Sequence, residues 1–184
     1  MGYYFFAASL PSLSIETPPP LSFERFLALC TEHLSSSDRA ALDDMLQGRG
    51  AASAFGFVRA WANKETQIRN AVVRHRATRA RQDAAPHLRP QKGVDLFVEK
   101  RVSDAFARPS PAERELALDR LRWTVLDELA GFDPFTGPAI LSYALKLKLA
   151  GRWAAMDPGT GRAAAEQLVS RSPETRQEPA NTRG

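Results

Sequence analysis

Apolar residues recur at steps of three or four along most of the chain, and this spacing predicts amphipathic helices. The longest segment without a proline runs from Ser53 to Gln82, and its only glycine is Gly56. The residues that share one face of this segment are Val58, Trp61, Glu65, Ile68, Val72, His75 and Arg79. The pattern predicts one helix of about thirty residues, roughly 45 Å long, which is much longer than most globular helices.

Shorter helices are predicted around this long helix from the same periodicity. They cover residues 23–34, 38–47, 94–107, 111–130, 138–156 and 162–169. The clearest start signal is Ser110, Pro111 and Glu113, an N-cap serine followed by a proline and a glutamate in the first helical turn. The helix from Pro138 is apolar on more than one side, which predicts that it is the most buried helix of the fold.

Both ends of the chain lack this periodicity. Tyr3 to Leu10 is aromatic and apolar but too short for an independent helix, so we expect an extended segment or short strand packed on the core. Residues 170–184 hold almost no apolar side chains and are expected to be a disordered tail. The prediction is an all-α fold with residues 1–169 as a single helical domain. It is a bundle of about six or seven helices with one long helix and a short extended N-terminal segment.

The large aromatic residues within the predicted helices are assigned to the structural core. They are Trp61, Trp123, Tyr143 and Trp153. We expect the first half of the long helix, through Trp61, to pack in the same core as the helix that carries Trp153. The second half, beyond the stretch Ile68–Val72, is then left as a candidate docking surface.

The composition is that of an ordinary globular protein, with 43% hydrophobic and 25% charged residues. Cys30 is the only cysteine, so no intrachain disulfide forms, and a reducing, cytoplasmic setting is expected. The N-terminus lacks the positive region of a signal peptide. No apolar run approaches the roughly 18 residues that span a bilayer.

The positive charge is concentrated in the long helix. Ser53–Gln82 holds seven Lys or Arg and one Glu, a net of +6, whereas the whole chain is +4, so the remainder sums to −2. The arginines of its second half, which we predict to bind a partner, are Arg69, Arg74, Arg76, Arg79 and Arg81. A solvated helix end is the alternative, because arginine near a helix C-terminus complements the dipole. An acidic protein is favoured over nucleic acid, since no aromatic residues interleave with the arginines to stack on bases.

No residue constellation predicts catalysis, a cofactor or a metal site. The histidines, which are far apart in the sequence, are His33, His75 and His87. Cys30 lies on the apolar face of its helix and is expected to be a buried thiol. The adjacent carboxylates Asp43–Asp44 and Asp127–Glu128 do not face each other on a helix and make poor acid–base pairs. The glycines of DPGTGR precede a predicted helix but lack the lysine of a phosphate loop.

Several segments resemble a small bacterial family of formerly uncharacterised proteins. They are GYYFFAASLPSL, PLSFERFLALCTEHLS, WANKETQIRNAVVRHRATRA and FDPFTGPAILSYALKLKLAGRWAAMDPGTGR. Genes of that family lie among those for the subunits of V/A-type rotary ATPases. The resemblance implies an equivalent of the stalk subunit called C in archaeal enzymes and d in eukaryotic V-ATPases.

Two functional hypotheses follow from the sequence. In the first, the protein is a non-catalytic subunit or accessory factor of a bacterial V-type ATPase. Its partners are then other subunits of a proton- or sodium-translocating ATPase, and it is cytoplasmic and peripheral to the inner membrane through the complex. In the second, it is a nucleic-acid-binding helical protein that uses residues 69–81, and its affinity falls steeply with salt. Neither hypothesis includes an enzymatic activity or a small-molecule ligand.

Overall fold

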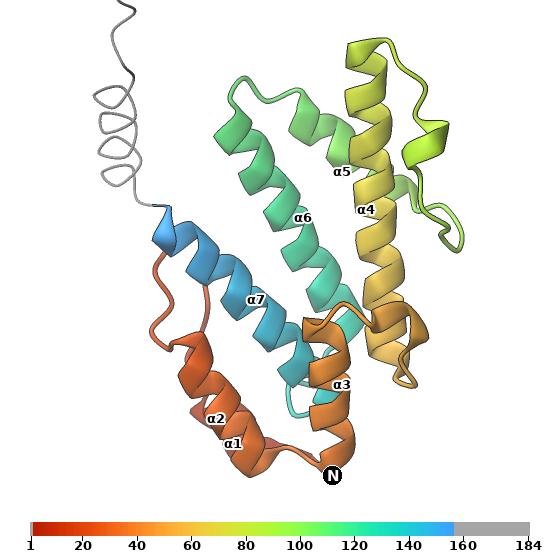
Figure 1. Ribbon diagram of the computed structural model, residues 1–184. Helices are drawn as coiled ribbons and strands as arrows, with labels where there is room; N and C mark the ends of the chain where they lie inside the picture. Colours follow the sequence, from red (N-terminus) through yellow and green to blue (C-terminus); the bar gives the residue numbers. More distant parts are fainter. Residues whose placement is uncertain (1, 157–184) are drawn as a thin grey trace, which may run out of the picture.

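The computed structural model describes residues 2–156, which form the predicted all-α bundle (Figure 1). The helices are α1 (Tyr4–Ser9), α2 (Phe23–His33), α3 (Ser36–Leu46), α4 (Gly56–Ala80), α5 (Leu96–Phe106), α6 (Pro111–Ala130) and α7 (Gly137–Ala155), with short 3-10 helices η1 (Gly50–Ala52) and η2 (Ala85–His87). The predicted helix at 162–169 and the predicted tail at 170–184 lie outside the described residues. No helix within residues 2–156 is both long and apolar enough to cross a membrane.

Side-chain caps set where several helices begin. Ser110 accepts a hydrogen bond from the backbone N–H of Glu113 at 3.1 Å, so α6 starts at the predicted Pro111. Ser35 accepts in the same way from the N–H of Asp38. Helix α3 therefore begins at Ser36, two residues before the predicted start. Ser35 is its N-cap, and Ser36 and Ser37 belong to its first turn.

The predicted long helix is α4, with 25 residues. It starts later than expected because residues 50–52 form η1 and Phe55 has an extended backbone. It ends at Arg81, whose left-handed backbone (φ 53°) stops the helix while its N–H bonds to carbonyls of the last turn. Figure 1 shows α4 along the right-hand side of the molecule, beside α5 and α6.

Two clusters of buried apolar residues meet along α4. The first joins α1, α2, α3, α7 and the start of α4, and includes Phe26, Val58 and Leu147. The second joins α4, α5 and α6, and includes Ile68 and Val102. Trp61 packs against both clusters. Val72 is the last buried residue of α4, and residues 73–80 are partly buried or exposed, so the helix changes character at the end of the stretch Ile68–Val72.

The aromatic residues assigned to the core lie at its edges. Trp61, Trp123, Tyr143 and Trp153 are all partly buried. The most completely buried large side chains are instead aliphatic or phenylalanine, among them Phe26, Ile68, Leu126, Ile140 and Leu147. Tyr143 illustrates the border position, because its hydroxyl donates to the Pro11 carbonyl at 2.9 Å and burial raises its pKa to about 12.

The N-terminal segment is a short helix rather than the expected extended piece, and this part of the prediction is wrong. The backbone N–H of Tyr3 donates to the Phe135 carbonyl at 2.7 Å, and the Tyr3 hydroxyl bonds to the Asp38 carboxylate. The same hydroxyl accepts from the N–H of Ser35 at 3.2 Å. These tertiary contacts hold α1 at a length that is marginal for a helix alone.

Candidate partner-binding surface

The five arginines predicted to bind a partner divide into two groups. Arg74 forms an ion pair with Glu99 of α5. Arg76 lies 3.8 Å from Glu115 of α6, and both side chains are largely exposed. The other three, Arg69, Arg79 and Arg81, are exposed and make no ion pair within residues 2–156. The surface available to a partner is thus smaller than the sequence predicted.

Arg69 is exposed, and Glu65, the carboxylate four residues before it on α4, is bound by another residue. The Glu65 carboxylate receives two hydrogen bonds from Arg122 of α6, from Nε at 2.9 Å and from Nη2 at 3.1 Å. A bidentate pair of this kind is stronger than an exposed ion pair between residues four apart on one helix, such as Glu65 with Arg69. It ties α4 to α6 between the two apolar clusters.

A row of amide side chains on α4 holds the connector that leads to α5. Asn63 accepts from the backbone N–H of Lys92 at 2.7 Å and donates to the carbonyl of the same residue at 2.9 Å. Gln67 also donates to that carbonyl, at 2.9 Å. Asn70 pairs in the same two-point way with the backbone of Arg89, at 2.7 and 3.0 Å. These contacts fix residues 89–92 along α4.

Sequence reasoning missed this attachment, although a signal was present. Asn63, Gln67 and Asn70 follow one another at steps of four and three, which places them on one face of the helix. A row of amides on one helix face matches the alternating donors and acceptors of an extended backbone. The adjacent connector, with Pro86, Pro90 and Gly93, supplies such a backbone.

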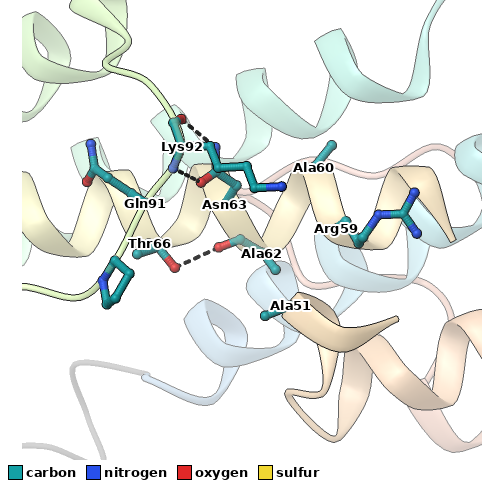
Figure 2. Close-up of a pocket in the computed structure, with 9 residues that line it drawn as sticks. Ala51, Arg59, Ala60, Ala62, Asn63, Thr66, Gln91 and Lys92 are labelled. Atoms are coloured by element: carbon teal, nitrogen blue, oxygen red, sulfur yellow. Dashed lines mark hydrogen bonds between the residues drawn. The ribbon is translucent and has the colours of Figure 1, made fainter. Parts of the chain in front are cut away.

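A groove of about 390 Å³ lies between η1, the first half of α4 and this connector (Figure 2). Its lining residues are Ala51, Arg59, Ala60, Ala62, Asn63, Thr66, Pro90, Gln91 and Lys92. Two of them are cations and none is acidic. Figure 2 shows the Lys92 side chain extending along α4 in the direction of Arg59. Both cations are exposed, and neither makes an ion pair in the described part of the chain.

The neutral polar groups of the groove already have partners inside the protein. The Asn63 side-chain amide is hydrogen-bonded to the backbone of Lys92, and the Thr66 hydroxyl donates to the Ala62 carbonyl at 2.8 Å. Gln91 accepts from Asn70 and donates to the Gly93 carbonyl. The groove therefore offers a ligand two positive charges above small apolar side chains, with few free neutral hydrogen-bonding groups.

A buried carboxylate, Asp119, is the second feature that the sequence did not reveal. Its side chain is fully buried and accepts hydrogen bonds from Arg122 (2.9 Å), the Trp153 indole (2.7 Å) and Arg152. Burial alone would lower the pKa of Arg122, but the nearby Glu65 and Asp119 raise it, so this guanidinium stays charged. Asp119 is enclosed by donors, which indicates a structural role in joining α6 to α7.

The remaining reactive groups are accounted for by packing. Burial raises the pKa of the Cys30 thiol to about 12, which disfavours the nucleophilic thiolate. The His33 ring lies tilted against that of Phe6, and the His75 ring stacks on that of Phe106, each with ring centroids 5.0 Å apart. Among residues 2–156 no group of three or more His, Cys, Asp or Glu side chains is arranged to hold a metal ion.

Comparison with known proteins gives one family match. Residues 92–172, less than half of the chain, match the model of a family described as Protein of unknown function (DUF2764). That description names no activity or partner, and nothing in the comparisons connects it with rotary ATPases. Neither the curated proteins nor the solved structures gave a match. The matched region begins at Lys92, in the groove, and includes α5, α6 and α7.

Proposed function

We propose that this protein is a non-catalytic, C/d-like subunit or accessory factor of a bacterial V-type ATPase that binds an acidic surface of another subunit. The complex is suggested by the resemblance of its YYFFAASLP and LKLKLAGRWAAMD segments to proteins encoded among rotary ATPase genes. The chemistry of the contact is supported by the groove beside α4. The protein would act on the cytoplasmic side and link or stabilise parts of the rotary complex.

The groove is the observation that carries the acidic-partner proposal. A small polar metabolite is normally held by several convergent hydrogen-bonding groups, and here those groups are already occupied. Arg59 donates one hydrogen bond to the Ser53 carbonyl at 2.8 Å, but neither it nor Lys92 has an acidic partner within residues 2–156. Two positive charges beside alanine side chains suit a carboxylate with an apolar neighbour. The exposed Arg69 lies on the same helix beyond the groove and extends the positive field.

Co-purification tests this proposal in the organism that encodes the protein. We expect the tagged wild-type chain to recover V-type ATPase subunits in low salt. The double variant Arg59→Glu/Lys92→Glu should recover them at least tenfold less, because each reversal replaces an attraction by a repulsion at a protein interface. Quantitative mass spectrometry measures the ratio, and circular dichroism checks that the variant is folded.

The matched control reverses two exposed cations on α2 and α7, Arg25→Glu and Lys148→Glu. It changes the net charge by the same amount and should leave recovery unchanged. Absence of all ATPase subunits from the wild-type sample contradicts the ATPase assignment. A gel shift with duplex or single-stranded nucleic acid that weakens steeply with salt would favour the nucleic-acid hypothesis instead.

A further inference from the structure

Three aromatic side chains near the N-terminus and the α6–α7 turn are exposed to an unusual degree. Phe5 is 94% exposed, Phe132 is 107% exposed and Tyr4 is 60% exposed. Tyr4 and Phe5 belong to α1, whereas Phe132 lies in the turn that precedes α7. Single exposed apolar residues are common, but a group of large aromatic side chains is typical of a binding surface.

The start of α1 is tied to the α6–α7 turn and to α3, so the segment that carries Tyr4 and Phe5 is not a loose chain end. The Tyr3 backbone bonds to the Phe135 carbonyl at 2.7 Å, and the Tyr4 ring lies against the Phe135 ring with centroids 4.4 Å apart. The Tyr3 hydroxyl is bonded to Asp38 at the start of α3. An ideal Cβ on Gly137 would lie 2.7 Å from that Asp38 carboxylate, so glycine permits this close approach. A surface ordered before binding loses less entropy on association.

An apolar groove of about 560 Å³ adjoins this aromatic surface. The walls of the groove include Leu10, Leu13, Trp123, Phe135 and Tyr143. Trp123 and Tyr143, which the sequence placed in the core, are partly buried because they line it. Phe135 belongs to both features, since it lines the groove and packs on Tyr4. Phe135 thus joins the groove to Tyr4, and Phe132 lies three residues before Phe135 in the same turn.

The exposed charged side chains beside the α6–α7 turn are acidic, and they favour a partner with basic side chains. Glu128 and Asp133, which lie within four residues of Phe132 in the sequence, are exposed and make no ion pair within residues 2–156. One oxygen of Asp133 accepts from the backbone N–H of Phe135 at 2.9 Å, and its negative charge has no cationic partner there. Asp127 is paired with Lys146, whose ammonium also lies 5.1 Å from the Trp123 ring centroid. The carboxylates of Glu128 and Asp133 would repel an anionic lipid surface. They would attract lysine or arginine side chains on a protein.

We propose that the aromatic surface and its groove bind a second protein partner through a segment that presents apolar side chains flanked by Lys or Arg. An amphipathic helix laid in a groove is the common form of such a contact. Figure 1 places α1 at the lower left and the connector after α4 at the right. The two surfaces therefore lie at different places on the bundle. This inference is independent of the proposed function.

Site-specific photocrosslinking tests the proposal in the intact protein. Phe5 and Phe132 are replaced one at a time by a photoreactive phenylalanine analogue, which keeps the aromatic shape and the fold. We expect one protein to be crosslinked from both positions, through a peptide that carries apolar residues and a net positive charge. The control position is Leu96 on α5, which is also highly exposed (79%) but lies outside the surface and should not give that product.

Charge reversal provides the second arm of the experiment. Glu128→Lys/Asp133→Asn, in which asparagine keeps the oxygen that accepts from the Phe135 N–H, should abolish the product at both positions. The matched change Glu24→Lys/Asp104→Asn on α2 and α5 should not. No product, a product with a second copy of this chain, or a crosslinked peptide of negative charge overturns the proposal. So does binding of the purified protein to phosphatidylserine-containing vesicles that Phe132→Ser abolishes. The variant Arg59→Glu/Lys92→Glu should no longer recover the ATPase subunits but should still give this crosslink. That result would show that the two surfaces bind independently.

Discussion

Asp119 shows how much one residue contributes to this fold. Its carboxylate accepts from Arg122, Arg152 and Trp153, and Arg122 also binds Glu65, so a single buried anion connects α4, α6 and α7. The sequence reveals Asp119 three residues before Arg122 on a helix. That spacing is equally typical of an exposed ion pair. Only the packing of α7 against α6 decides that the pair is buried.

Replacing Asp119 should be strongly destabilising. Asp119→Ala leaves the Trp153 indole and one Arg122 donor without an acceptor inside the protein, so we expect a loss of about 3–5 kcal/mol in the free energy of unfolding. Asp119→Asn, which keeps one acceptor oxygen, should lose less. Urea unfolding measures both, with Asp104→Ala on the exposed face of α5 as the control. A loss below about 1 kcal/mol for Asp119→Ala would show that the network contributes only as much as a surface pair.

At the scale of elements, the junction between α4 and α5 combines a helix cap with an ion pair. Asp95 accepts from the N–H groups of Phe97 and Val98 and pairs with Lys64 of α4. The hydrogen bond from Lys64 lowers the pKa of Asp95 below its ordinary value of 3.8, against the opposing effect of burial. One carboxylate thus starts α5 and fastens it to α4.

This junction predicts a pH dependence with a defined sign. Because the folded pKa of Asp95 is lower than the unfolded one, its ionised form stabilises the protein fully above about pH 4, and this contribution is lost as the pH falls through the folded pKa. Asp95→Asn keeps a good cap but loses the charge, so its deficit in unfolding free energy should be largest near neutral pH and shrink in acid. Asp95→Ala should lose a further 1 kcal/mol or so because the cap is also removed. A deficit of Asp95→Asn that is constant from pH 7 to pH 3 would contradict this assignment.

The two apolar clusters define the molecule as a whole. Cys30 is buried in the first cluster and Val102 in the second, and α4 and Trp61 belong to both. A helix shared by two clusters couples their stability, because neither can lose it without exposing apolar surface of the other. The described part of the chain should therefore unfold as one cooperative unit.

The Cys30 thiol reports this cooperativity directly. Burial raises the pKa of this thiol to about 12 and prevents reagents from reaching it. Iodoacetamide at pH 8 should therefore label Cys30 only when the first cluster opens. We expect the urea midpoint for labelling to coincide with the midpoint for loss of helix by circular dichroism. A Cys30→Ala/Ala54→Cys variant, with the thiol at an exposed position, should be labelled without urea. Labelling of Cys30 well before helix loss would show that the clusters open separately.

The sequence by itself determined the helices, because their periodicity and caps are local properties. Ser110 marks the start of α6, and the absence of proline between Ser53 and Gln82 allows α4. The arginine-rich charge of α4 was equally visible. These features depend on neighbours three or four residues apart, which a linear chain displays.

Only the tertiary structure decided which charges are free, since pairing depends on residues far apart in the chain. Glu65 binds Arg122 and Arg74 is paired with Glu99, whereas Arg59 and Lys92 in the groove make no ion pair among residues 2–156. It also made a helix of α1, through contacts of Tyr3 with Phe135 and Asp38. A helix this short gains its stability from the surface on which it lies, and that surface exists only once the bundle has formed.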